Sequence, residues 1–168
     1  MGKKSIAIPE RIAEEIERRG LDIEELVLKA ISRALHLDPE EIIKVRIELA
    51  GRSLAEAEDY IAKEDPVQAS KKLYKAAEEC IKALAEKFKV QLETVEKRGK
   101  WDTWLLGQAS RDLAERLGEE KLIHAWTNAY DIHVWGFHEA KYRTEDVRKS
   151  LPIIKWLLDY TRKTIETV

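Results

Sequence analysis

The sequence predicts an all-α protein, an antiparallel helical bundle with a short N-terminal extension that is either strand–helix–helix or two-helix. Helix-start signals recur along the chain, glycines follow the segments they open, and apolar residues repeat every three or four positions. The 168 residues, 44% hydrophobic and 37% charged, are enough for one compact domain and a small appendage. We therefore predict a dimerising N-terminal segment over residues 1–37 and a bundle over 38–168.

Capping residues divide the chain into helices. An Asp stands at an N-cap position, with Glu or Gln three residues later, at Asp22, Asp38 and Asp65. Stop signals follow at Gly20, Gly99 and Gly118. These signals predict helices over residues 9–19, 22–36, 39–63, 66–89, 102–117, 119–142 and 145–167. The turn at 63–66 is so short that the helices on either side of it must form an antiparallel hairpin.

The segment 66–89 separates its side chains into two faces. Its apolar face holds Ala69, Leu73, Ala77, Cys80, Ile81, Leu84 and Phe88, and its charged face holds Lys71, Lys75, Glu78, Lys82 and Glu86. We interpret the charged face as solvated, with i,i+4 ion pairs, and Cys80 as a small buried hydrophobe. In the preceding helix Arg46 falls within the apolar arc. For this arginine we favour a snorkelling side chain over a buried arginine paired with a carboxylate.

Composition and charge exclude several classes of protein. The 30 basic and 32 acidic residues nearly cancel, so no whole-chain field attracts nucleic acid or anionic lipid. Apolar runs are too short for a membrane span, the N-terminus lacks the apolar core of a signal peptide, and Cys80 is the lone cysteine. We therefore expect a cytoplasmic protein without a membrane partner. The scarcity of heat-labile residues, with Asn128 the single asparagine, is typical of thermophilic proteins.

The N-terminal segment pairs a short alternating stretch, Ser5-Ile6-Ala7-Ile8, with two helices. This pattern resembles the ribbon-helix-helix DNA-binding module, an obligate dimer whose paired strands enter the major groove. The segment carries seven basic and seven acidic residues, however, and so has no basic footprint for DNA. A dimerisation unit and a two-helix extension of the bundle remain alternatives to DNA binding.

The rest of the chain resembles the archaeal PaREP family in three blocks. These are Val67-Gln68-Ala69-Ser70-Lys71-Lys72-Leu73-Tyr74-Lys75-Ala76-Ala77-Glu78-Glu79, then Arg98-Gly99-Lys100-Trp101, and then Leu122 to Glu139, which ends in Ile132-His133-Val134-Trp135-Gly136-Phe137-His138-Glu139. The family has no assigned reaction. Its helical domain is similar to the HEPN superfamily, which includes nucleotide-binding partners of nucleotidyltransferases and metal-independent ribonucleases. The resemblance therefore implies a HEPN-like antiparallel bundle.

The ribonuclease members carry an Arg and a His on one helix, with four to six residues between them. Here that spacing joins Asn128 to His133, and an asparagine supplies no positive charge for the scissile phosphate. In a regular helix over 119–142, His133 also falls near the centre of the apolar face. We therefore predict that His133 is a buried, hydrogen-bonded histidine, and we keep catalysis by His133 and Asn128 as the alternative.

The opposite face of the same predicted helix gathers the ligand-binding candidates. They recur every three or four residues as His124, Asn128, Asp131, Trp135 and His138. We favour coverage of this face by another helix over a site in which Trp135 stacks on a ring and the polar groups bind its edges. No metal site is expected. His124, Asp131 and His138 each lie about 10 Å from the next along a straight helix, which is too far for one ion. Trp101 and Trp104, beside Arg98 and Lys100, are candidates for the mouth of a pocket.

The function we predict is a non-catalytic helical binding or interaction module for a nucleotide or nucleic acid, working as a homodimer without a cofactor. Two alternatives stay open. One is a HEPN-type metal-independent ribonuclease that acts through His133. The other is a ribbon-helix-helix transcriptional regulator with the bundle as its sensor domain.

Overall fold

The structure is a computed structural model that describes residues 4–167. It divides into two compact units, Met1–Asp38 and Pro39–Val168. The described residues are helical or irregular and include no strand, which confirms the all-α class. No helix among them combines the length and the apolar character that a membrane span requires.

The N-terminal unit consists of α1 (Glu10–Arg18) and α2 (Ile23–Leu35). Asp22 begins α2 as predicted, since its carboxylate accepts the backbone N–H of Glu25 at 3.0 Å. The predicted strand at 5–8 is wrong, because residues 4–9 adopt no regular structure. A strand is stable only when a neighbouring strand pairs with its N–H and C=O groups, and residues 4–167 contain no such neighbour. The two-helix form of the extension therefore describes this unit.

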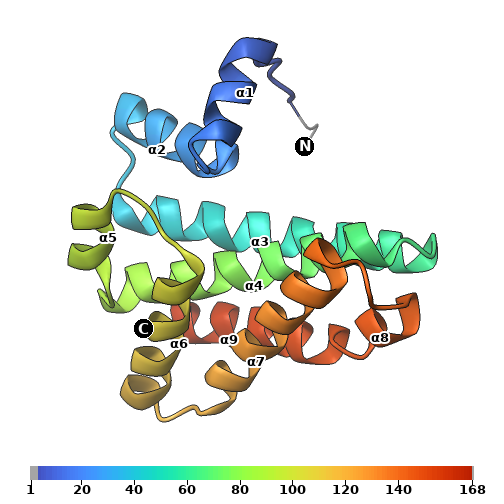
Figure 1. The fold of residues 1–168 in the computed structure, drawn as a ribbon. Coiled ribbons are helices and arrows are strands. Elements are labelled where there is room, and N and C mark those ends of the chain that lie inside the picture. The colour runs from blue at the N-terminus through green and yellow to red at the C-terminus, as the bar shows by residue number, and fades with distance from the viewer. Residues whose placement is uncertain (1–3, 168) are drawn as a thin grey trace. The chain divides into compact units, whose positions relative to one another are not determined.

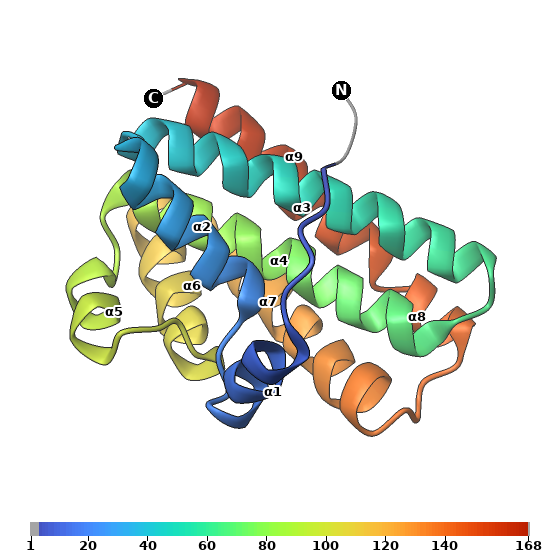
Figure 2. The same cartoon turned by 90° about the horizontal axis from the view of Figure 1, so that it is seen from above.

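The second unit is an antiparallel helical bundle built around α4 (Figures 1 and 2). Its helices are α3 (Pro39–Ala62), α4 (Pro66–Phe88), α5 (Leu92–Arg98), α6 (Thr103–Leu117), α7 (Lys121–Asp131), the π-helix η1 (Ile132–His138), α8 (Thr144–Arg148) and α9 (Leu151–Thr167). The long hairpin of α3 and α4 turns at Asp65, whose side chain caps α4 by accepting the N–H of Gln68 at 3.0 Å. α4 contacts α3 and α9 as well as α6, α7 and η1.

Small side chains let so many helices reach α4. Ala69, Ala76 and Ala77 are fully buried, and with them Leu73 and Leu84 form the middle of the core. The predicted apolar face is thus confirmed, and Cys80 is buried within it. The predicted solvated face is wrong at Lys82, which is buried and pairs with Glu78 at 2.7 Å.

Arg46 is a buried partner of carboxylates, so the snorkelling interpretation is wrong. Its side chain is 3% exposed, and its guanidinium donates to Glu79 at 2.9 Å and to Glu86 at 2.7 Å. Glu79 also pairs with Lys75 at 3.0 Å. Because α4 carries carboxylates 33 and 40 positions away from Arg46, the charge is neutralised across the hairpin instead of in water.

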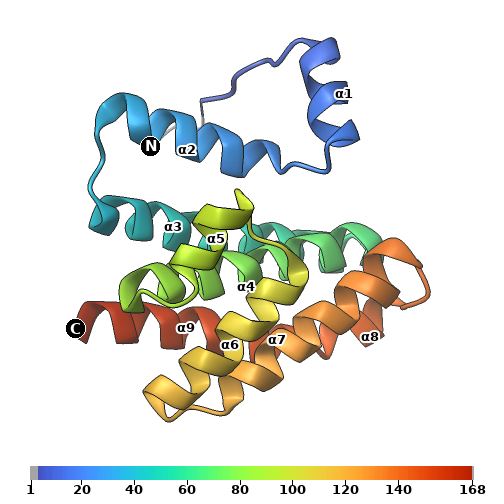
Figure 3. The ribbon, with the colours of Figure 1, turned by 60° about the vertical axis from the view of Figure 1, so that its left-hand side comes forward.

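The helices of the bundle differ from the prediction in three places. The segment 92–98 forms α5, which precedes the positive-φ residue Gly99. The predicted helix 119–142 ends at His138 and changes to π geometry after Asp131. The predicted helix 145–167 is interrupted at 149–150, between α8 and α9. Figure 3 shows α6 and α7 side by side on one side of the bundle, where they form the walls of a pocket.

Candidate functional site

The π-helix η1 brings His133 and His138 together. In an α-helix, residues five positions apart lie about 140° apart around the axis, so these histidines were predicted on opposite faces. In η1 the backbone closes over five residues, and the N–H of Glu139 donates to the carbonyl of Val134 at 2.8 Å. Residues five apart therefore stand one above the other, and the Nε2 atoms of the two histidines lie 3.0 Å apart.

His133 lies at the edge of the core and is half-buried, instead of buried as predicted. Its ring stacks on Tyr74 of α4, with centroids 3.9 Å apart and planes 22° apart. The Nδ1 atom of His133 is buried and has no hydrogen-bond partner among the described residues. Burial, together with the neighbouring His138, lowers the pKa of His133 to about 4. The imidazole of His133 is therefore neutral near pH 7, and its Nδ1 atom is shielded from solvent.

Besides His138, the predicted helix face held four ligand-binding candidates, and each of them has a different environment. Asp131 accepts the hydroxyl of Tyr142 at 2.6 Å, and this bond raises the pKa of Tyr142 to about 12. The amide oxygen of Asn128 is buried and has no partner within residues 4–167. His124 and Trp135 are exposed.

His124, Asn128 and Asp131 keep the predicted spacing within α7, whereas the change of period after Asp131 turns His138 away from their face and toward His133. Trp135 is 46% exposed, and its carbonyl accepts the N–H groups of Lys141 and Tyr142, which ends the π-helix. Among the described residues, no three His, Cys, Asp or Glu side chains are arranged to hold a metal ion.

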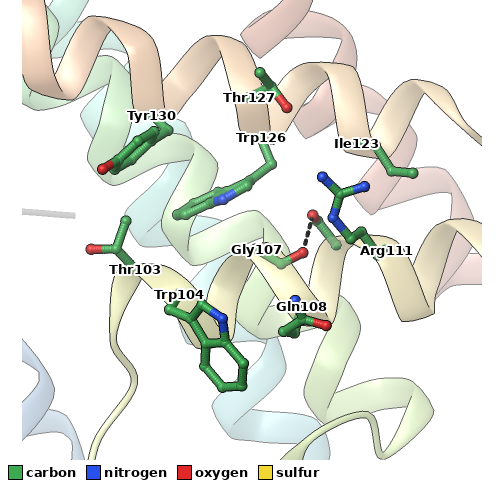
Figure 4. Close-up of a pocket in the computed structure, with 10 residues that line it drawn as sticks. Thr103, Trp104, Gly107, Gln108, Arg111, Ile123, Trp126, Thr127 and Tyr130 are labelled. Carbon is green, nitrogen blue, oxygen red and sulfur yellow. Dashed lines mark hydrogen bonds between the residues drawn. The ribbon is translucent and has the colours of Figure 1, made fainter.

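A pocket of about 480 Å³ lies between α6 and α7 (Figure 4). It is lined by Thr103, Trp104, Gly107, Gln108, Ser110, Arg111, Ile123, Trp126, Thr127 and Tyr130. Asp102 begins α6 by accepting the N–H of Leu105 at 2.8 Å, and this cap fixes the turn that presents Trp104. Gly107 gives room for the indole of Trp126, because a Cβ on Gly107 would stand 3.2 Å from its Nε1.

The pocket has an aromatic end and a cationic end. In Figure 4, Thr103 and Tyr130 lie at one end and Arg111 at the other, with Trp126 between them. Trp104 is 62% exposed and Tyr130 47%, although both are large apolar rings. The guanidinium of Arg98 lies 5.4 Å from the ring centre of Trp104 and restrains it by a cation–π contact. Trp104 thus lies at a pocket mouth, whereas Trp101 packs against the core.

Tyr74 links the pocket to the histidine pair. Its ring lies 5.6 Å from that of Trp126, which lines the pocket, and its other side carries His133. Burial raises the pKa of the Tyr74 hydroxyl, so this residue stays neutral. The rings of Trp126, Tyr74 and His133 therefore form a continuous aromatic path from the pocket to η1.

Sequence reasoning missed most of the pocket. It singled out Trp104 but no other residue of the pocket lining. One signal was available, since a Trp two turns before Arg111 and a Trp and a Tyr four apart on the next helix suggest a lined groove. Which sides of α6 and α7 face each other, however, depends on how both pack on α4.

Comparison with known proteins places the second unit in a family. The model of the archaeal PaREP1/PaREP8 family matches residues 45–158. A crystal structure of a Sulfolobus solfataricus protein is 32% identical, with a TM-score of 0.63, over 70% of this chain and 96% of its own. A solution structure of the same target, the Orf c02003 protein, is 33% identical, with a TM-score of 0.62, over 70% of this chain and 92% of its own. No curated protein matches. The chain belongs to the archaeal PaREP1/PaREP8 family.

Proposed function

We propose that this protein is a non-catalytic binding module that holds a nucleotide in the pocket between α6 and α7. One observation carries the proposal: two large aromatic rings, Trp104 and Tyr130, are exposed at the rim of a pocket instead of being buried in the core. Exposed aromatic rings beside a concave site provide stacking surfaces for a planar ligand such as a nucleobase.

The polar lining supports the same class of ligand. Thr103, Gln108 and Thr127 supply hydroxyl and amide groups that can bind the edge of a base. Arg111, at the end away from Tyr130, supplies the cation that a phosphate group needs. A nucleotide therefore fits the pocket with its base at the aromatic end and its phosphate at the cationic end.

The charge beyond Arg111 favours a mononucleotide over a nucleic acid strand. Arg111 and Ile123 also line a neighbouring hollow, whose other residues include Glu115 and Glu120. Further phosphates of a strand that continued in this direction would meet these carboxylates, which repel them. We therefore place a single nucleotide in the pocket.

The test measures binding of AMP by titration calorimetry and binding of a labelled oligouridylate by fluorescence polarisation. Replacing Trp104 by Ala should weaken AMP binding at least about fivefold, since stacking on one ring contributes about 1 kcal/mol or more. Trp135→Ala is the matched control, because Trp135 is similarly exposed but does not line the pocket.

Arg111→Gln should weaken AMP binding but leave adenosine binding unchanged. Arg148→Gln, at an exposed arginine of α8, should change neither.

Three outcomes would contradict the proposal. Wild-type protein that binds neither probe has no such site, and equal losses in the Trp104 and Trp135 variants would place stacking outside the pocket. Cleavage of the oligouridylate without metal, lost in His133→Ala, would replace the proposal with the ribonuclease alternative. Tighter binding of the oligouridylate than of AMP would indicate a nucleic acid strand as the ligand.

A further inference from the structure

We propose that His133 and His138 form a two-histidine site for a divalent transition-metal ion of the Zn²⁺, Ni²⁺ or Cu²⁺ class. The two Nε2 atoms lie 3.0 Å apart, at hydrogen-bond distance, and a metal ion would displace the proton that the two rings share. Two metal–nitrogen bonds of about 2.0–2.1 Å, at angles between a right angle and the tetrahedral angle, place their nitrogens about 2.9–3.4 Å apart. The observed separation falls within that range.

The relative orientation of the rings agrees with this site. The ring centroids are 4.4 Å apart, and the planes are nearly perpendicular at 83°. If the two Nε2 atoms pointed straight at each other, the centroids would lie about 5.4 Å apart, since Nε2 stands about 1.2 Å from the ring centre. The two rings therefore approach at an angle, as they would when both Nε2 atoms bind one ion that lies to the side of the line between them.

The backbone and the packing hold the pair in place before any ion arrives. The five-residue period of η1 sets the histidines one above the other. Tyr74 stacks on His133, and the ring of Phe137 lies 4.9 Å from that of His138. His138 is exposed, so an ion can reach the pair from solvent.

The chemistry of the donors selects the class of ion. Imidazole nitrogen suits Zn²⁺, Ni²⁺ and Cu²⁺, whereas Mg²⁺ and Ca²⁺ prefer oxygen. No third His, Cys, Asp or Glu joins the pair among the described residues, so water occupies the remaining positions and the affinity is modest. Neither histidine lines the pocket between α6 and α7, so the metal site does not depend on the proposed nucleotide site.

The test is calorimetric titration of the full chain with Ni²⁺, and then with Zn²⁺ in competition. The chain has four histidines, so the variant His36→Ala/His124→Ala leaves the pair as its only histidines. We expect one ion per chain in the wild type and the same affinity in this double variant. His138→Ala should weaken binding at least about tenfold, because it removes one of two protein ligands. His138 is exposed, so this variant should keep its circular dichroism spectrum.

A spectroscopic measurement separates a built site from adventitious binding. With Cu²⁺ as the probe, the electron paramagnetic resonance spectrum of the double variant should show coupling to two imidazole nitrogens. Equal Ni²⁺ affinity in His138→Ala and wild type, loss of binding in the double variant, or coupling to a single nitrogen would each overturn the proposal.

Discussion

At the scale of single residues, the contact between Gly136 and Ser70 holds η1 against α4. A Cβ added to Gly136 would stand 2.1 Å from the Oγ of Ser70 and 2.8 Å from its Cβ. Ser70 is fully buried in α4, so it has no free direction in which to move. This close approach keeps His133 on Tyr74, and only glycine allows it.

Gly136→Ala should therefore destabilise the fold by about 1–3 kcal/mol through overpacking, as measured by urea unfolding. Gly51→Ala is the matched control. Gly51 lies inside α3, and its added Cβ would meet only the far end of the flexible Arg162 side chain, 2.8 Å away. In a helix interior this change should be neutral or stabilising by up to about 1 kcal/mol. Equal effects of the two substitutions would contradict the packing argument.

At the scale of elements, local signals and long-range packing decided different features. Asp22 and Asp65 cap their helices as predicted, because a cap depends on residues three positions away. The π-helix packs against α4 at Gly136, and its neighbour Ser70 lies far away in the sequence. A helical wheel with a constant period failed after Asp131, where it placed His133 and His138 on opposite faces.

The α3–α4 hairpin yields a prediction at this scale. Arg46→Ala leaves Glu79 buried without its arginine partner, and we expect a loss of about 3 kcal/mol in unfolding free energy. Arg52→Ala is the control, because Arg52 is exposed on the same helix and its contact with Glu48 measures 3.5 Å. This control should change stability by less than about 0.5 kcal/mol. Arg46→Ala with the stability of the wild type would show that the ion pairs of Arg46 add nothing to the stability of the hairpin.

At the scale of the whole molecule, the N-terminal unit carries exposed apolar side chains. Ile31 and Leu35, four apart on α2, are exposed, as are Ile6 and Ile12. A unit with only α1 and α2 is too small to bury these side chains within itself. We propose that the homodimer expected from the sequence associates through these side chains of the N-terminal unit.

Ile31→Lys/Leu35→Lys should therefore shift the protein toward monomer and weaken self-association at least about tenfold, because each buried aliphatic side chain contributes about 1.5–3 kcal/mol. Sedimentation equilibrium measures the change. Trp135→Lys is the control, since Trp135 is an exposed apolar residue of the bundle. A monomeric wild type, or a variant that dimerises as well as the wild type, would exclude this surface as the dimer interface.

The sequence by itself determined the all-α class, the course of the α3–α4 hairpin, the apolar face of α4 and the family. These features depend on caps, on the period of apolar residues and on motifs, all of which lie within short stretches of chain. Only the tertiary structure decided the partners of Arg46, the meeting of His133 with His138, and the pocket that joins Trp104 to Tyr130. The first and the last depend on the side of a helix that faces its neighbours, and the meeting of the histidines depends on the π geometry of η1. Packing decides which side of a helix that is, because buried volume and buried charge must be matched across elements distant in sequence.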